Sequence, residues 1–108
     1  MNKLEVREIC FNIISRTGKA MDSIDKSLSL AKNNDFKDAK DMLEEANKVI
    51  IEAHNFQTEL LNSEAREERI EFGPLLIHAQ DHLMFSQLYL KITRELVSLY
   101  EKNKDENK

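Results

Sequence analysis

Two histidines, a carboxamide and a carboxylate lie within five successive positions of the chain: His78, Gln80, Asp81 and His82. Apolar residues flank this group on both sides. Because each helical residue turns about 100° from the last, His78 and His82 lie one turn apart on the same side, with Asp81 on the other flank of His78. The spacing therefore gathers ionisable groups on an otherwise apolar helix, which calls for a chemical or structural reason.

Histidine offers three roles at such a position. A neutral imidazole nitrogen, abundant near pH 7, can accept a phosphoryl group and pass it on. Histidines at i and i+4 also form a common helical metal pair, although the glutamate of the metalloprotease pattern His-Glu-x-x-His is absent here. The third role is structural. Spacing alone does not separate nucleophile, metal ligand and packed side chain.

Asp81 adds a constraint of its own. A buried carboxylate is destabilising unless it is paired, hydrogen-bonded or bound to a metal. If this helix lies at a symmetric interface, copies of Asp81 can converge on the symmetry axis, where their mutual repulsion favours a bound cation.

Composition narrows the class of protein. The chain has 108 residues, 33% of them charged, with 2 Gly and 1 Pro, which is typical of a single all-helical domain. A net charge of -4 argues against general nucleic-acid binding. The single cysteine, Cys10, lies in an apolar pattern that predicts burial and fits a reducing compartment. No apolar run approaches the ~20 residues of a membrane span, and no signal peptide is evident, so we expect a cytoplasmic protein.

The apolar periodicity predicts an antiparallel up-down-up bundle in a single domain, 1–108. Its three helices are expected at about 4–30, 36–65 and 74–100. Asn33-Asn34-Asp35 and Gly73-Pro74 mark the two breaks, because these residues favour turns and helix starts. The charged and Asn-containing tail 101–108 is expected to fray.

Two apolar strips run along the third predicted helix. One contains Leu76, Leu83, Leu90 and Val97, and the other continues from His78 through Phe85, Tyr89, Ile92, Leu96 and Leu99. Two companion helices do not cover so wide an apolar surface, so the pattern predicts a subunit interface. Elsewhere, Gly18 is expected to be tolerated in the first helix or packed against a neighbour. His54 is expected at the edge of a packed face, hydrogen-bonded at a helix interface.

Leu75 to Met84 resembles the signature of the enzyme IIA component of the lactose/cellobiose class of the bacterial phosphoenolpyruvate-dependent sugar phosphotransferase system. Three further stretches resemble this family in the same order along the chain. They are Gly18-Lys19-Ala20, Asn34 to Ala39 and Glu52 to Leu60. The sequence departs from the family between Glu64 and Glu68, where charges replace a Gly-containing connector.

The resemblance implies a three-helix bundle that assembles as a homotrimer. His78 would accept a phosphoryl group from the histidine-containing phosphocarrier protein and pass it to the IIB component during uptake of a β-linked disaccharide such as lactose, cellobiose or diacetylchitobiose. Gln80 and His82 would support His78, and Asp81 would bind one Mg²⁺ per trimer on the symmetry axis. No contact with nucleic acid and no insertion into the membrane is implied.

Two other hypotheses stay open on the residues alone. A helical scaffold would use the histidines only for packing. A metal-binding bundle would bring His54, His78 and His82 together as ligands. Neither of these hypotheses requires phosphorylation. Detection of a phosphoryl group on His78 would therefore distinguish a phosphoryl carrier from a scaffold or a metal-binding bundle.

Overall fold

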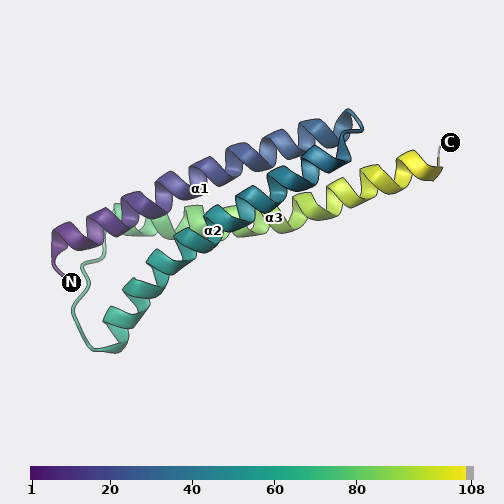
Figure 1. Ribbon diagram of the computed structural model, residues 1–108. Helices are drawn as coiled ribbons and strands as arrows, with labels where there is room; N and C mark the ends of the chain where they lie inside the picture. Colours follow the sequence, from purple (N-terminus) through teal and green to yellow (C-terminus); the bar gives the residue numbers. More distant parts are fainter. Residues whose placement is uncertain (107–108) are drawn as a thin grey trace.

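Three long helices make up the structure, a computed structural model that describes residues 1–106. They are α1 (Lys3–Lys32), α2 (Phe36–Ala65) and α3 (Pro74–Glu106). α1 leads away from the N-terminal end of the molecule, α2 returns beside it, and α3 runs again in the direction of α1 (Figure 1). The result is a rod of 60 × 20 × 20 Å, and the predicted all-helical class is confirmed.

α1 ends in a hydrogen-bonded turn that stops the helix sharply. The Asp35 N–H donates to the Leu30 carbonyl at 2.9 Å and the Asn34 N–H to that of Ala31 at 3.1 Å. Asn34 has a φ of 65°, the left-handed conformation that asparagine tolerates. α2 ends with the same bonding pattern around Glu67, whose φ is 61°. The predicted break at Asn33-Asn34-Asp35 is thus confirmed.

The two following helices begin at predicted residues. The Asp35 side chain accepts a hydrogen bond from the Asp38 N–H at 3.3 Å and caps α2. Pro74 occupies the first position of α3, and the Gly73 carbonyl accepts from the Ile77 N–H at 3.2 Å.

α3 is longer than the sequence predicts. The expected fraying of 101–106 is wrong, because these residues continue the helix; 107–108 lie outside the described residues. No glycine or proline follows Tyr100 to stop the helix. The added turns are also tethered to α2, since Glu101 pairs with Lys40 at 2.9 Å and Lys104 lies 5.5 Å from the centre of the Phe36 ring.

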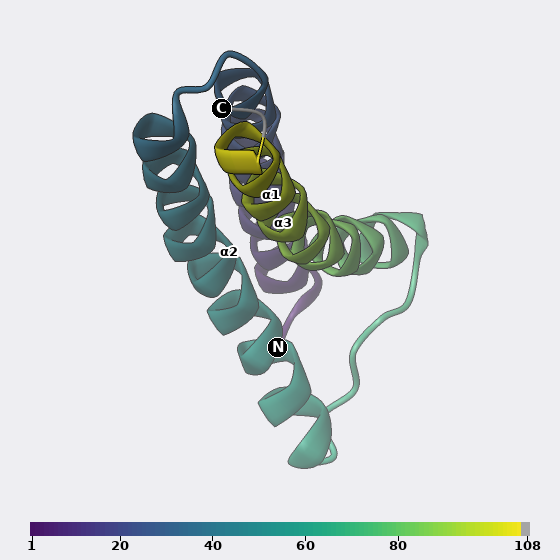
Figure 2. The same ribbon diagram turned by 90° about the vertical axis from the view of Figure 1, so that its right-hand side faces the viewer.

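The core consists of two apolar clusters, one toward each end of the rod. All three helices contribute to both. Burying one Leu, Ile or Val side chain contributes about 1.5–3 kcal/mol. The C-terminal part of α2 diverges from α3 (Figure 2). Both α2 and α3 therefore pack mainly against α1. The predicted burial of Cys10 is confirmed, and burial raises the pKa of its thiol.

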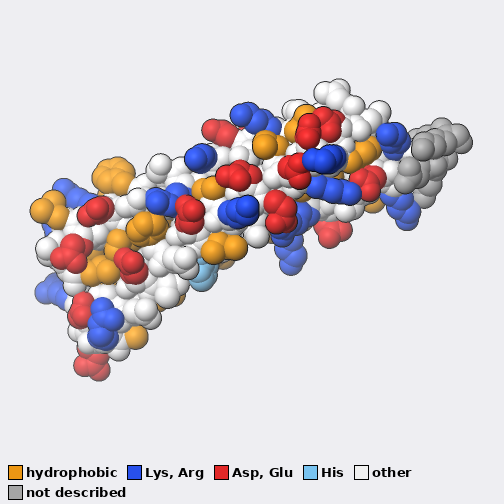
Figure 3. Space-filling view, viewed as in Figure 1, with side chains coloured by type: hydrophobic (Ala, Val, Ile, Leu, Met, Phe, Trp, Pro, Cys, Tyr) orange, Lys and Arg blue, Asp and Glu red, His pale blue; other side chains and the backbone are white. Residues whose placement is uncertain are grey.

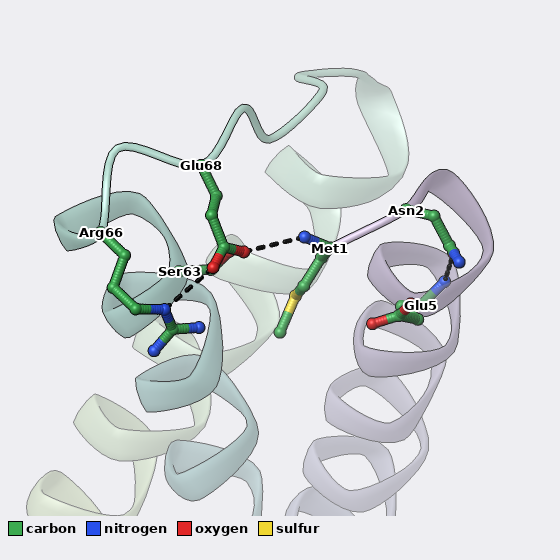
Figure 4. A network of polar contacts seen from close by, with 6 residues as sticks. All are labelled: Met1, Asn2, Glu5, Ser63, Arg66 and Glu68. Carbon is green, nitrogen blue, oxygen red and sulfur yellow. Dashed lines mark hydrogen bonds and ion pairs between the residues drawn. The ribbon is translucent and has the colours of Figure 1, made fainter.

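Glu68 makes most of the polar contacts that hold the charged connector between α2 and α3. Its carboxylate accepts hydrogen bonds from the Ser63 hydroxyl at 2.6 Å, the Arg66 Nε at 2.9 Å and the Met1 amino group at 2.9 Å (Figure 4). These bonds, led by that of Ser63, lower the pKa of Glu68 to about 2. The connector is therefore held against the start of the chain rather than simply solvated.

The surface is unevenly polar. The face drawn in Figure 3 carries interspersed acidic and basic side chains along its length. α3 instead exposes large apolar side chains: Ile77, Met84, Phe85, Leu88, Ile92 and Leu99, here called the α3 stripe. Of the two predicted strips, that of Leu76, Leu83, Leu90 and Val97 is buried. The other does not turn into core within this chain, since Phe85, Ile92 and Leu99 are half or more exposed.

Candidate functional site

The predicted histidines border an open hollow between α1 and α3. It has a volume of about 440 Å³ and is lined by Met21 of α1 and by His78, Asp81, His82 and Phe85 of α3. Three of the four predicted site residues therefore share one surface feature. An open hollow suits a reaction with another protein better than the enclosure of a small molecule.

His78 and His82 are in direct contact. Their ring centroids lie 4.4 Å apart and the ring planes meet at 70°. His78 is exposed, whereas His82 is half-buried. An exposed imidazole with a second imidazole at its side is accessible to a reacting group and has a polar neighbour.

Thr17 of α1 completes this group, and the sequence did not predict it. Its hydroxyl oxygen lies 3.3 Å from His82 Nδ1, and the side chain is fully buried. Helical spacing relates residues of one helix to each other, but it does not say which residue of another helix faces them. No pattern in the sequence could have singled out Thr17.

Gln80 lies apart from the hollow. Its Nε2 donates to Gln57 Oε1 of α2 at 2.6 Å, and the side chain is half-buried. Because Gln80 follows His78 by two residues, it faces the opposite side of the helix. The structure thus brings together His78, Asp81 and His82, while Gln80 links α3 to α2.

His54 is exposed on α2, so its predicted place at a helix interface is wrong. Among the side chains that the structure describes, residues 1–104, no three of His, Cys, Asp or Glu are grouped closely enough to hold a metal ion. The alternative in which His54, His78 and His82 bind a metal together therefore finds no support in the arrangement of a single chain. Asp81 is exposed and lies along the α3 stripe between Ile77 and Met84.

Comparison with known proteins decides the family. The model of the phosphotransferase-system lactose/cellobiose-specific IIA subunit matches residues 8–101. The chain belongs to this family. The predicted resemblance is confirmed, and the matched residues include most of all three helices.

Individual relatives extend this match over nearly the whole chain. The lactose-specific EIIA component of Staphylococcus epidermidis is 39% identical over 102 residues, covering 94% of this chain and 98% of the relative. The cellobiose-specific enzyme IIA of Bacillus anthracis superimposes with a TM-score of 0.91 at 38% identity, covering 97% of this chain and 94% of that structure.

A third relative was solved with a partner. The IIA(Chitobiose)–HPr complex of the N,N′-diacetylchitobiose branch of the Escherichia coli phosphotransferase system matches with a TM-score of 0.80 and 35% identity, covering 92% of this chain and 96% of that one. The three IIA relatives are named for three different sugars at similar identity, so the likeness gives the class of carrier and not its sugar. In residues 1–106, none of the helices combines the length and apolarity needed to cross a membrane.

Proposed function

We propose that this IIA subunit carries a phosphoryl group on His78 during uptake of a β-linked disaccharide. His78 accepts the group from the phosphohistidine of the phosphocarrier HPr and passes it to a cysteine of the IIB component. The observation that carries the proposal is the exposed His78 ring, packed against His82 in an open hollow of a IIA chain. The relative solved with HPr supports the first of the two partners.

The chemistry requires little from the protein beyond position. An unprotonated nitrogen of His78 attacks phosphorus, the new N–P bond forms, and the N–P bond to the donor histidine breaks. Each imidazole keeps its other proton, so no separate base is needed. His82 is proposed to support His78 from within the hollow. The Gln80 side chain is hydrogen-bonded to Gln57, so any effect of Gln80 on His78 is indirect.

We also propose that three copies assemble through the α3 stripe. An unpartnered apolar face of this length is typical of a surface that another protein covers. Asp81 lies within this face, between Ile77 and Met84, where its carboxylate would be poorly solvated after assembly.

A cation would relieve the repulsion between the Asp81 carboxylates. One chain offers a single carboxylate there, and no cluster of potential ligands among the described side chains of residues 1–104 could hold a metal alone. Three copies would supply three carboxylate oxygens, the ligand type that Mg²⁺ prefers. When bound, Mg²⁺ would supply positive charge between the subunits and take no part in phosphoryl transfer.

Relay phosphorylation tests the carrier function. The purified chain, incubated with labelled phosphoenolpyruvate and the components that phosphorylate HPr, should gain one acid-labile, alkali-stable phosphoryl group per chain. His78→Ala should abolish labelling. His54→Ala is the matched control, because it removes an exposed histidine of α2 and should leave labelling unchanged.

Two results would contradict the proposal. Absence of label on the wild-type chain would show that it is not a carrier. Normal labelling of His78→Ala would show that another residue accepts the group.

A further inference from the structure

Thr17 is a buried hydroxyl placed between its own helix and a histidine of another. Its oxygen lies 2.8 Å from the Ile13 carbonyl oxygen, 3.2 Å from that of Ile14 and 3.3 Å from His82 Nδ1. The exposed fraction of Thr17 is 0%. A threonine hydroxyl has one proton to donate and two lone pairs that accept.

The carbonyls decide where that proton goes. A carbonyl oxygen can only accept, and that of Ile13 is the nearest partner, so the hydroxyl donates to Ile13. The Thr17 oxygen therefore meets His82 as an acceptor, and Nδ1 of His82 carries the ring proton. The bond made by one imidazole nitrogen sets the state of the other, so Nε2 of the neutral ring is left unprotonated.

We infer that Thr17 is a positioning residue of the phosphoryl site and acts through His82. This inference rests on the proposed function of His78. The two nitrogens of an imidazole point in nearly opposite directions, so Nε2 of His82 is directed away from Thr17, and His82 borders the hollow that it shares with His78. An acceptor at Nε2 can take the ring N–H of His78, which leaves the other nitrogen of His78 free to bond to phosphorus.

The other two threonines of the chain make no such contact. Thr58 donates to the His54 carbonyl of its own helix at 3.1 Å. Thr93 is fully buried in α3, and its hydroxyl has no hydrogen-bond partner in residues 1–106. Thr93 lies eleven residues beyond His82, about 16 Å along the helix, so it provides a buried threonine remote from the site.

Nitrogen-15 NMR of labelled histidines tests the tautomer directly on the unphosphorylated protein. The chain has three histidines, and His54→Gln and His78→Gln variants assign them. In the wild type, His82 should carry its proton on Nδ1. Thr17→Val should lose this preference, Thr17→Ser should keep it because the hydroxyl remains, and Thr93→Val should leave it unchanged.

The initial rate of labelling by phosphorylated HPr gives the second readout. Because misplacement of a reacting group slows a reaction steeply, Thr17→Val should react about tenfold more slowly than the wild type. Thr17→Ser should restore most of the rate, and Thr93→Val should match the wild type.

Each failure has a separate meaning. A proton on Nε2 of wild-type His82 overturns the inference, as does an unchanged tautomer or rate in Thr17→Val or an equal loss in Thr93→Val. If Thr17→Val does not fold, the wild-type tautomer and the behaviour of Thr17→Ser decide. A wild-type chain that is never labelled contradicts the proposed function, while the tautomer measurement still tests the role of Thr17.

Discussion

At the scale of single residues, the Tyr89 phenol donates a hydrogen bond to the Asp25 carboxylate between α3 and α1. This bond, followed by partial burial and the nearby negative charge, raises the pKa of Tyr89 to about 12. The raised pKa means that the folded state favours the neutral phenol. Its contribution to stability is therefore complete below about pH 10, the ordinary tyrosine pKa, and is lost as the pH rises from there through 12.

Asp25→Asn should return the pKa of Tyr89 toward its ordinary value of about 10, because the amide carries no charge and is a weaker acceptor. The ultraviolet absorbance of tyrosinate, followed against pH in a Tyr100→Phe background, reports Tyr89 alone, since the chain has two tyrosines. A Tyr89 titration unchanged by Asp25→Asn would show that the carboxylate does not control it.

Residue-level prediction from the sequence was strongest where one helix holds the whole pattern. His78, Asp81 and His82 share a hollow because the spacing along α3 alone places them there. Thr17 and Gln57 were beyond reach, because their contacts with His82 and Gln80 depend on how α1 and α2 are rotated against α3. The prediction for His54 was wrong for a similar reason. Ala53 is buried, but the next residue along the helix, His54, already faces solvent.

At the scale of the helices, Gly18 interrupts the interior of α1 without a packing reason in this chain. A Cβ built at Gly18 has no atom within 4 Å, so the expectation that glycine is simply tolerated there holds within the described residues. Gly18→Ala should raise the free energy of unfolding by about 1 kcal/mol, because alanine stabilises a helix interior relative to glycine. Urea unfolding at one fixed protein concentration measures this change.

Gly73→Ala is the control for Gly18→Ala. Gly73 likewise has free space around it, but it precedes the first residue of α3, where alanine is a poor cap. Gly73→Ala should therefore not raise the free energy of unfolding. A loss of stability in Gly18→Ala would instead indicate that another chain packs against this part of α1.

The helix boundaries were predictable where residues close to the boundary in sequence start or stop the helix. Asn33-Asn34-Asp35 and Gly73-Pro74 restrict the backbone directly, so α2 and the start of α3 fall where expected. The end of α3 was not predictable in this way, because its last turns contact Lys40 and Phe36 of α2. Periodicity likewise identified two apolar strips on α3 but could not say which one faces α1 and α2.

At the scale of the whole molecule, we expect the proposed assembly through the α3 stripe to depend on a metal bound at Asp81. The wild-type particle should have about three times the chain mass of 12.6 kDa by light scattering and should weaken when Mg²⁺ is chelated. Asp81→Leu should remove this dependence and form the same particle in chelator, because the repelling charges are gone.

Asp22→Leu is the control, since it makes the same change at an exposed acid of α1. It should keep the dependence on metal. A monomeric wild type would contradict assembly through the α3 stripe, and stoichiometric Mg²⁺ binding by Asp81→Leu would place the metal elsewhere.

The openness of the hollow around His78 would also limit the lifetime of the phosphoryl group proposed there. Enzymes protect reactive intermediates by closing over them and expelling water, but within residues 1–106 the hollow of His78 is open to solvent. In a single chain, water would therefore reach a phosphorylated His78. The lifetime of the N–P bond would then be set by its own hydrolysis, so such a carrier suits rapid handover between partners and not storage.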